Sequence, residues 1–174
     1  DAALKGKKLF LHFEAIMGKS KIYVNGKLLA EHFGGYLPVV VDVTDALEFG
    51  KENLIAVWAD NSNDPNYPPG KQQEVLDFTY FGGIYRDCWL IAHNQVFITD
   101  PNYENEEAGG GLFVAYNNVS DHSAEVLLKI QIRNSGRKAF KGVVEYELQQ
   151  PDGQQVASLN SVIRIKPGKS TYSS

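Results

Sequence analysis

The chain has 174 residues, a single cysteine and a formal net charge of −4 at pH 7. This charge offers no basic face for nucleic acid, and one cysteine excludes both an intrachain disulfide framework and a multi-cysteine zinc site. Apolar residues make up 43 % of the chain, which is enough for a core, and the lack of any apolar run of 18 residues predicts no membrane-spanning helix.

The first half of the sequence alternates between apolar and polar residues, which is typical of half-buried β-strands. In the first expected strand, Leu9, Leu11 and Phe13 fall on one face. Asn25-Gly26 predicts a two-residue hairpin turn, because both positions of such a turn need a positive φ. The strands expected in this half are 8–13, 20–24, 27–30, 39–43, 54–59 and 84–92.

The alternation disappears between residues 59 and 80. Residues 60–70 are too polar and too rich in proline for a strand. A loop of this length is uncommon in a compact domain and is often functional, so it is the first place to look for a site.

Alternation returns after residue 94, and no window in the chain shows a helical period. Strands separated by short turns favour an all-β fold built from antiparallel sandwiches. We expect one domain over 1–94 and a second over 95–174, because a long-looped, aromatic-rich half gives way to a regular one. The strands expected in the second half are 96–99, 112–116, 126–133, 144–149 and 162–165.

The sequence contains no motif for a metal or a phosphate-bearing cofactor. The four histidines are not spaced to share a metal, so all four are expected to be structural. Asp60-x-Ser62-x-Asp64 begins like a calcium loop but lacks the glycine and the bidentate glutamate that follow in such loops. We therefore predict no cofactor and no metal. Cys88 is expected to be a buried, inert thiol.

One carboxylate differs from the others, which suit solvated strand edges and turns. Asp77 lies between Leu76 and Phe78 near the end of the long loop. A carboxylate among aromatic rings suits sugar recognition, because it accepts hydrogen bonds from hydroxyl groups while a ring stacks on the apolar face of the sugar. The alternative is a structural ion pair with Arg86.

The first half resembles the N-terminal domain of glycoside hydrolase family 2. The motifs that carry the resemblance occur in the family's order across residues 7–92, whereas the match of residues 95–174 rests mostly on their position. These motifs are Phe-Leu-His-Phe-Glu-Ala at 10–15, Ile-Tyr-Val-Asn-Gly-Lys at 22–27, Glu-His-Phe-Gly-Gly-Tyr-Leu-Pro at 31–38, Asp-Val-Thr-Asp at 42–45, Glu-Asn-Leu-Ile-Ala-Val at 52–57, Asp-Phe at 77–78 and Gly-Gly-Ile-Tyr-Arg-Asp at 82–87.

The resemblance implies a galactose-binding-like jelly roll that is truncated at its N-terminal side, followed by an immunoglobulin-like sandwich that is truncated at its C-terminal side. In the family a TIM barrel follows and carries both catalytic glutamates, so we expect no catalytic residue in this chain. The resemblance also implies that Asn25 and Asp77 contact a terminal β-galactoside at the rim of the barrel's pocket. The expected partners are this carbohydrate and the barrel of the same chain. The parent's compartment stays open between a secreted and a cytoplasmic location.

Three functions compete. The first is a non-catalytic part of a retaining β-galactosidase, or of a β-glucuronidase or β-mannosidase, with Asp77 favouring the galactosidase. The second is a stand-alone carbohydrate-binding module that uses exposed aromatic residues, for which Trp58, Tyr67 and Tyr80 are candidates. The third is a purely structural pair of sandwiches, which the ordered family motifs disfavour.

Overall fold

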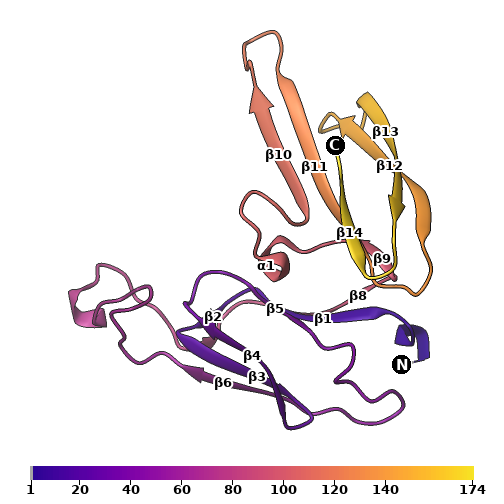
Figure 1. Ribbon diagram of the computed structural model, residues 1–174. Helices are drawn as coiled ribbons and strands as arrows, with labels where there is room; N and C mark the ends of the chain where they lie inside the picture. The colour runs from indigo at the N-terminus through magenta and orange to yellow at the C-terminus, as the bar shows by residue number, and fades with distance from the viewer. Residues whose placement is uncertain (1) are drawn as a thin grey trace. The chain divides into compact units, whose positions relative to one another are not determined.

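The computed structural model describes residues 2–174 and divides the chain into two compact units, 1–94 and 95–174. Both units are built almost entirely from antiparallel strands, which confirms the all-β prediction (Figure 1). Among the described residues, no helix has both the length and the apolar character needed to cross a membrane.

The first unit contains two three-stranded sheets and one small two-stranded sheet, ordered β5-β1-β8, β4-β3-β6 and β2-β7. Its elements are the 3₁₀ turn η1 (Ala2–Leu4), β1 (Lys8–Phe13), β2 (Ile16–Met17), β3 (Lys19–Val24), β4 (Lys27–Phe33), β5 (Val39–Asp42), β6 (Ile55–Asp60), the 3₁₀ turn η2 (Gln73–Val75), β7 (Gly83–Ile84) and β8 (Cys88–His93).

The core of the first unit lies between the two larger sheets, as in a sandwich. The predicted inward face of β1 is confirmed, because Leu9, Leu11 and Phe13 are at most 3 % exposed. They pack with Ile22 and Val24 of β3. Each Å² of buried apolar surface stabilises the fold by roughly 25 cal/mol. Burial of this cluster therefore stabilises the packing of the two sheets against each other.

Two details of the first unit differ from the sequence predictions. The single strand expected over 84–92 is split into β7 and β8, because β7 pairs with β2 while β8 pairs with β1. Cys88 is exposed rather than buried, since β8 is an edge strand of its sheet within the described residues. Partial burial still raises the pKa of the Cys88 thiol, which disfavours the reactive thiolate.

The second unit pairs a four-stranded sheet with a long hairpin. Its elements are β9 (Val96–Ile98), α1 (Pro101–Glu104), β10 (Leu112–Asn117), β11 (Glu125–Asn134), β12 (Phe140–Gln149), β13 (Gln155–Ile165) and β14 (Lys169–Ser173). The short helix α1 begins where the Asp100 side chain accepts hydrogen bonds from the next backbone amides and Pro101 occupies the first turn.

The core of the second unit forms where β11 faces the β12–β13 hairpin. Ile130 and Ile132 of β11 pack with Tyr146, Ile163 and Ile165, and all five are at most 6 % exposed. The strand expected over 162–165 is much longer than predicted, because the polar outer face of β13 hides its alternation. The strand β14 was not predicted.

Candidate functional site

Asn25 occupies the turn between β3 and β4. Asn25 and Gly26 have φ values of 51° and 80°, which confirms the predicted turn conformation. The Asn25 Nδ2 donates hydrogen bonds to the Ala46 carbonyl oxygen and to Asn53 Oδ1, both at 2.9 Å. Its Oδ1 accepts one from the Leu54 amide at 2.9 Å. The side chain therefore ties the hairpin to the loop before β6, with one lone pair of Oδ1 left over.

Asp77 lies in the long loop that joins β6 to β7, directly after η2. Its side chain is exposed, and so are Phe78 and Phe81, at 49 % and 73 %. The Arg86 guanidinium lies 5.3 Å from the centre of the Tyr85 ring. Asp77 thus lies in an exposed part of the loop, with exposed aromatic residues one and four positions after it.

The structure does not bring Asn25 and the long loop together. Asp60, the last residue of β6, is opposite Lys19 at the start of β3. The other end of the loop leads into β7, which pairs with β2, the strand just before β3. Asn25 follows the other end of β3, six residues away, or roughly 20 Å along a strand. Figure 1 shows the loop leaving the β4-β3-β6 sheet at the end opposite the β3–β4 turn.

Gly18 lets the beginning of the loop pass close to β3. A Cβ atom there would lie 2.0 Å from the Asp60 carbonyl oxygen and 2.9 Å from the Asn61 Cα. The φ of Gly18 is +86°, a value that L-residues rarely adopt. Both constraints require glycine at this position, so the direction in which β6 delivers the loop depends on Gly18.

A set of polar and aromatic contacts then anchors residues 61–70. Lys19 Nζ forms a 2.9 Å ion pair with Asp64 and lies 5.6 Å from the centre of the Tyr67 ring. The Tyr67 ring in turn lies 6.4 Å from that of Phe33. The outer face of β3 and β4 therefore holds the first half of the loop.

The ionisable groups of this anchor favour their charged forms. Hydrogen bonds from Ser62 lower the pKa of Asp60, and those from the Asn66 backbone and from Lys19 lower the pKa of Asp64. The hydrogen bond to Asp64 raises the pKa of Lys19. The side chains of Lys19 and Asp64 are partly exposed, so solvent screens the pair and its energetic value is small.

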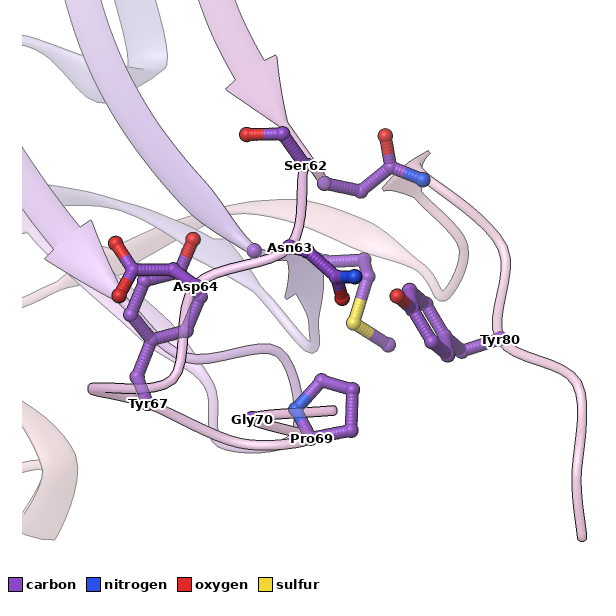
Figure 2. Close-up of a pocket in the computed structure, with 10 residues that line it drawn as sticks. Ser62, Asn63, Asp64, Tyr67, Pro69, Gly70 and Tyr80 are labelled. Carbon is purple, nitrogen blue, oxygen red and sulfur yellow. The ribbon is translucent and has the colours of Figure 1, made fainter. Parts of the chain in front are cut away.

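A small pocket lies between the anchored part of the loop and the segment before β7. Figure 2 shows Tyr67, Pro69 and Tyr80 around it, and Met17 and Gly18 also line it. Its volume of about 10 Å³ has room for one water molecule and none for a sugar ring.

The carboxylates of the calcium-like motif at 60–64 bind backbone amides of the loop itself. Asp60 and Asp64 accept hydrogen bonds from the backbone amides two residues later. Within residues 2–174 no three side chains of His, Cys, Asp or Glu gather as metal ligands.

A larger hollow of about 130 Å³ lies beside the loop, where Pro68 faces the segment after β4. It is lined by His32, Phe33, Tyr36 and Leu37 together with two glycines. Burial lowers the pKa of His32, so the neutral imidazole is favoured. A hollow of this apolar character suits an apolar group better than the hydroxyl groups of a sugar.

Of the three aromatic residues expected for a stand-alone binding module, one is well placed. Trp58 is 46 % exposed on the outer face of β6, with Lys21 Nζ 5.8 Å from the centre of its ring. Tyr67 is half-buried beneath Lys19, and Tyr80 lines the small pocket. These three residues therefore do not form a flat platform of several exposed rings.

Sequence reasoning missed the residues that position the loop. Lys19 lies outside the strand expected over 20–24 and Phe33 outside the one expected over 27–30, and Gly18 was not singled out. The register that places Lys19 opposite both Phe33 and Asp60 is the information that reveals the anchor. A pairing register between distant strands is not written in either strand alone.

Comparison with known proteins identifies the first unit. Residues 1–94 match the family model described as the sugar-binding domain of glycosyl hydrolases family 2. The chain belongs to this family. Its N-terminal sugar-binding domain occurs here with the two-sandwich arrangement that the motifs implied.

Relatives of known activity fall into two substrate classes. The chain is 32 % identical to a β-galactosidase of Thermoanaerobacter pseudethanolicus over 94 % of its own length and 20 % of the relative's. It is also 32 % identical to a β-glucuronidase of Formosa agariphila, over 95 % of its own length and 17 % of the relative's. The family 2 chain thus spans about a fifth of these relatives.

Solved structures agree on the fold. The β-glucuronidase of Bacteroides uniformis superposes with a TM-score of 0.86 at 29 % identity, over 99 % of this chain and 20 % of that one. Galactosidase and glucuronidase relatives are equally similar, so these comparisons do not separate the two sugars.

Proposed function

We propose that this family 2 chain is the non-catalytic N-terminal part of a retaining β-galactosidase that hydrolyses terminal β-galactosides. In this proposal the catalytic carboxylates lie in a barrel domain of the same protein, and the chain supports that barrel. The first unit would be a truncated jelly roll and the second a truncated immunoglobulin-like sandwich.

One observation carries the choice of sugar, namely the exposed Asp77 carboxylate in the loop segment that also exposes Phe78 and Phe81. A carboxylate accepts hydrogen bonds from the hydroxyl groups of a neutral galactosyl unit. It repels the carboxylate of a glucuronide, by about 4 kcal/mol for two charges 4 Å apart at an effective dielectric constant of 20. Asp77 therefore favours the galactoside over the glucuronide.

The role of Asn25 as a second sugar contact stays a prediction. Its side chain is exposed, but three hydrogen bonds already hold it in the turn. A sugar that touches Asp77 would reach Asn25 only if the loop folds back along the sheet. Asp77 is for this reason the residue on which the proposal depends.

The exposed ring of Trp58 favours a second candidate function, a stand-alone carbohydrate-binding module. Titration of the 174-residue chain with galactose separates the two. A partial pocket should bind in the millimolar range or more weakly, whereas micromolar affinity would favour the module.

Kinetics of the intact enzyme test the role of Asp77. Asp77→Ala should raise KM and lower kcat for nitrophenyl β-galactoside, because the hydrogen bonds tighten in the transition state. Glu74→Ala is the matched control, since Glu74 is an exposed carboxylate of the same loop. Equal kinetics for both variants would leave Asp77 a scaffold residue. The isolated chain should show no turnover, and measurable hydrolysis by it would overturn the proposal.

A further inference from the structure

The basic residues of the second unit gather at one end of it. Six of the eight lysines and arginines in 95–174 lie within residues 134–144 and 160–174, two segments that contain no aspartate or glutamate. All six are exposed, and we call them the basic cluster: Arg137, Lys138, Lys141, Arg164, Lys166 and Lys169. The net charge of −4 for the whole chain conceals this local excess of positive charge.

A buried asparagine joins the two segments that carry the cluster. Asn134 is 1 % exposed, and its Nδ2 donates hydrogen bonds to the carbonyl oxygens of Lys138 at 2.8 Å and of Ile165 at 3.1 Å. Its own carbonyl oxygen accepts a hydrogen bond from the Gly168 amide at 2.8 Å. The turns that follow β11 and β13 therefore lie at the same end of the unit (Figure 1), and the fold itself brings the six cations together.

Two members of the cluster face each other across a strand pair. Lys141 of β12 is directly opposite Arg164 of β13, and both point outward because Ile163 and Ile165 point into the core. Like charges in directly opposite positions destabilise a sheet. Among residues 2–174, no ion pair includes any of the six cations. The fold thus retains a repulsion that a negatively charged ligand would relieve.

A hollow of about 470 Å³ opens at this end of the hairpin, within the range of about 300–1,000 Å³ that is usual for ligand sites. Lys141, Arg164 and Lys166 line it together with Phe140 and Ile165. The Phe140 side chain is 37 % exposed. An aromatic ring beside several cations suits an acidic sugar, because the ring contacts the apolar face of the sugar while the cations bind its carboxylate or sulfate groups.

We propose that the basic cluster binds an acidic polysaccharide, a polymer that carries sulfate or carboxylate groups along its chain. A polymer can reach cations that are spread over two turns and a strand pair, and a polysaccharide suits a chain whose first unit matches a sugar-binding domain. In an enzyme that hydrolyses terminal sugars, such binding raises the local concentration of chain ends. The inference goes beyond the proposed function, because neither Asp77 nor hydrolysis enters it.

Calorimetric titration of the intact enzyme with heparin, a sulfated polysaccharide, tests the inference at low ionic strength. Heparin should bind and neutral dextran should not, and added salt should weaken the binding because it screens exposed charges. Lys141→Gln combined with Arg164→Gln should weaken heparin binding by about tenfold or more, as expected for two basic residues at an anionic surface.

The matched control is Lys5→Gln combined with Lys27→Gln, which removes the same charge from exposed positions of the first unit and should leave the affinity for heparin unchanged. Loss of the opposed charges at Lys141 and Arg164 should not lower the temperature of unfolding, so a loss of binding would not reflect a loss of fold.

Three results would overturn the inference. Equal losses of affinity in the two double variants would show that heparin responds only to net charge. Binding by the 174-residue chain that the intact enzyme lacks would assign the cluster to contact with another part of the same protein. Tighter binding of a DNA oligonucleotide than of heparin at the same salt concentration would assign it to nucleic acid.

The heparin titration and the kinetics of Asp77 fail independently. Nitrophenyl β-galactoside carries no acidic polymer, so the double variant of Lys141 and Arg164 should hydrolyse it at the unchanged rate. Absence of heparin binding leaves the role of Asp77 standing, and unchanged Asp77→Ala kinetics leave the role of the basic cluster standing.

Discussion

Replacing Gly18 by alanine tests how the structure positions the long loop. The new Cβ would lie 2.0 Å from the Asp60 carbonyl oxygen, whereas real Cβ atoms essentially never approach a heavy atom within 3.0 Å. The β2–β3 junction and the end of β6 must therefore move apart by an ångström or more. Gly26→Ala is the matched control, because its φ is +80° and nothing lies within 4 Å of its Cβ position.

The two variants separate backbone strain from steric overlap. A left-handed backbone costs an alanine about 1–2 kcal/mol, which both variants share. Forcing packed segments apart adds about 1–3 kcal/mol at Gly18 alone. We thus expect a loss of about 2–5 kcal/mol in the free energy of unfolding for Gly18→Ala and about 1–2 kcal/mol for Gly26→Ala.

Urea unfolding followed by tryptophan fluorescence measures this difference. The two tryptophans of the chain, Trp58 and Trp89, both lie in the first unit, so the signal reports on that unit by itself. Equal losses for the two variants would refute the close approach of Gly18 to Asp60, and with it the account of how β6 delivers the loop.

Three further changes test individual contacts. Burial raises the pKa of Asp42, but hydrogen bonds from Lys8 and Thr44 outweigh it and lower the pKa overall. The stability that this shift contributes is present above the unfolded pKa of about 3.9 and is lost as the pH falls through the folded pKa. Asp42→Asn should therefore flatten the acid limb of a profile of thermal unfolding against pH. Arg133→Met leaves the Glu104 carboxylate, 5 % exposed and 2.6 Å from Arg133, without its cation; calorimetry of the second unit should show a loss of about 2 kcal/mol, which Glu104→Leu in the same chain restores. Asn25→Ala removes three hydrogen bonds and should cost about 2 kcal/mol with unchanged KM for the galactoside if the residue only holds the turn; a raised KM would make it a sugar contact.

The strands of the first sandwich are predictable because each carries its own alternation. Leu9, Leu11 and Phe13 identify the inner face of β1 without any knowledge of its partners, and Asn25-Gly26 identifies a turn through its need for positive φ. The split of 84–92 into β7 and β8 was not predictable in this way, because the break arises from two different partner strands.

The candidate site was only partly predictable for the same reason. Asp77 stands out in the sequence through its aromatic neighbours, and the structure leaves it exposed among them. The relation of Asn25 to the loop depends on the register of β3 with β6, a long-range pairing that no local pattern records. Exposure of Cys88 likewise follows from the edge position of β8 and not from the composition of the strand.

The preference of the intact enzyme between two sugars tests the central claim most directly. We predict a higher kcat/KM for nitrophenyl β-galactoside than for nitrophenyl β-glucuronide, and a smaller ratio of the two in Asp77→Asn, which removes the charge but keeps the shape. A loss of at least tenfold on the galactoside, the cost of about one charged hydrogen bond, is expected for this variant. Preference for the glucuronide, or a ratio that Asp77→Asn leaves unchanged, would contradict the account.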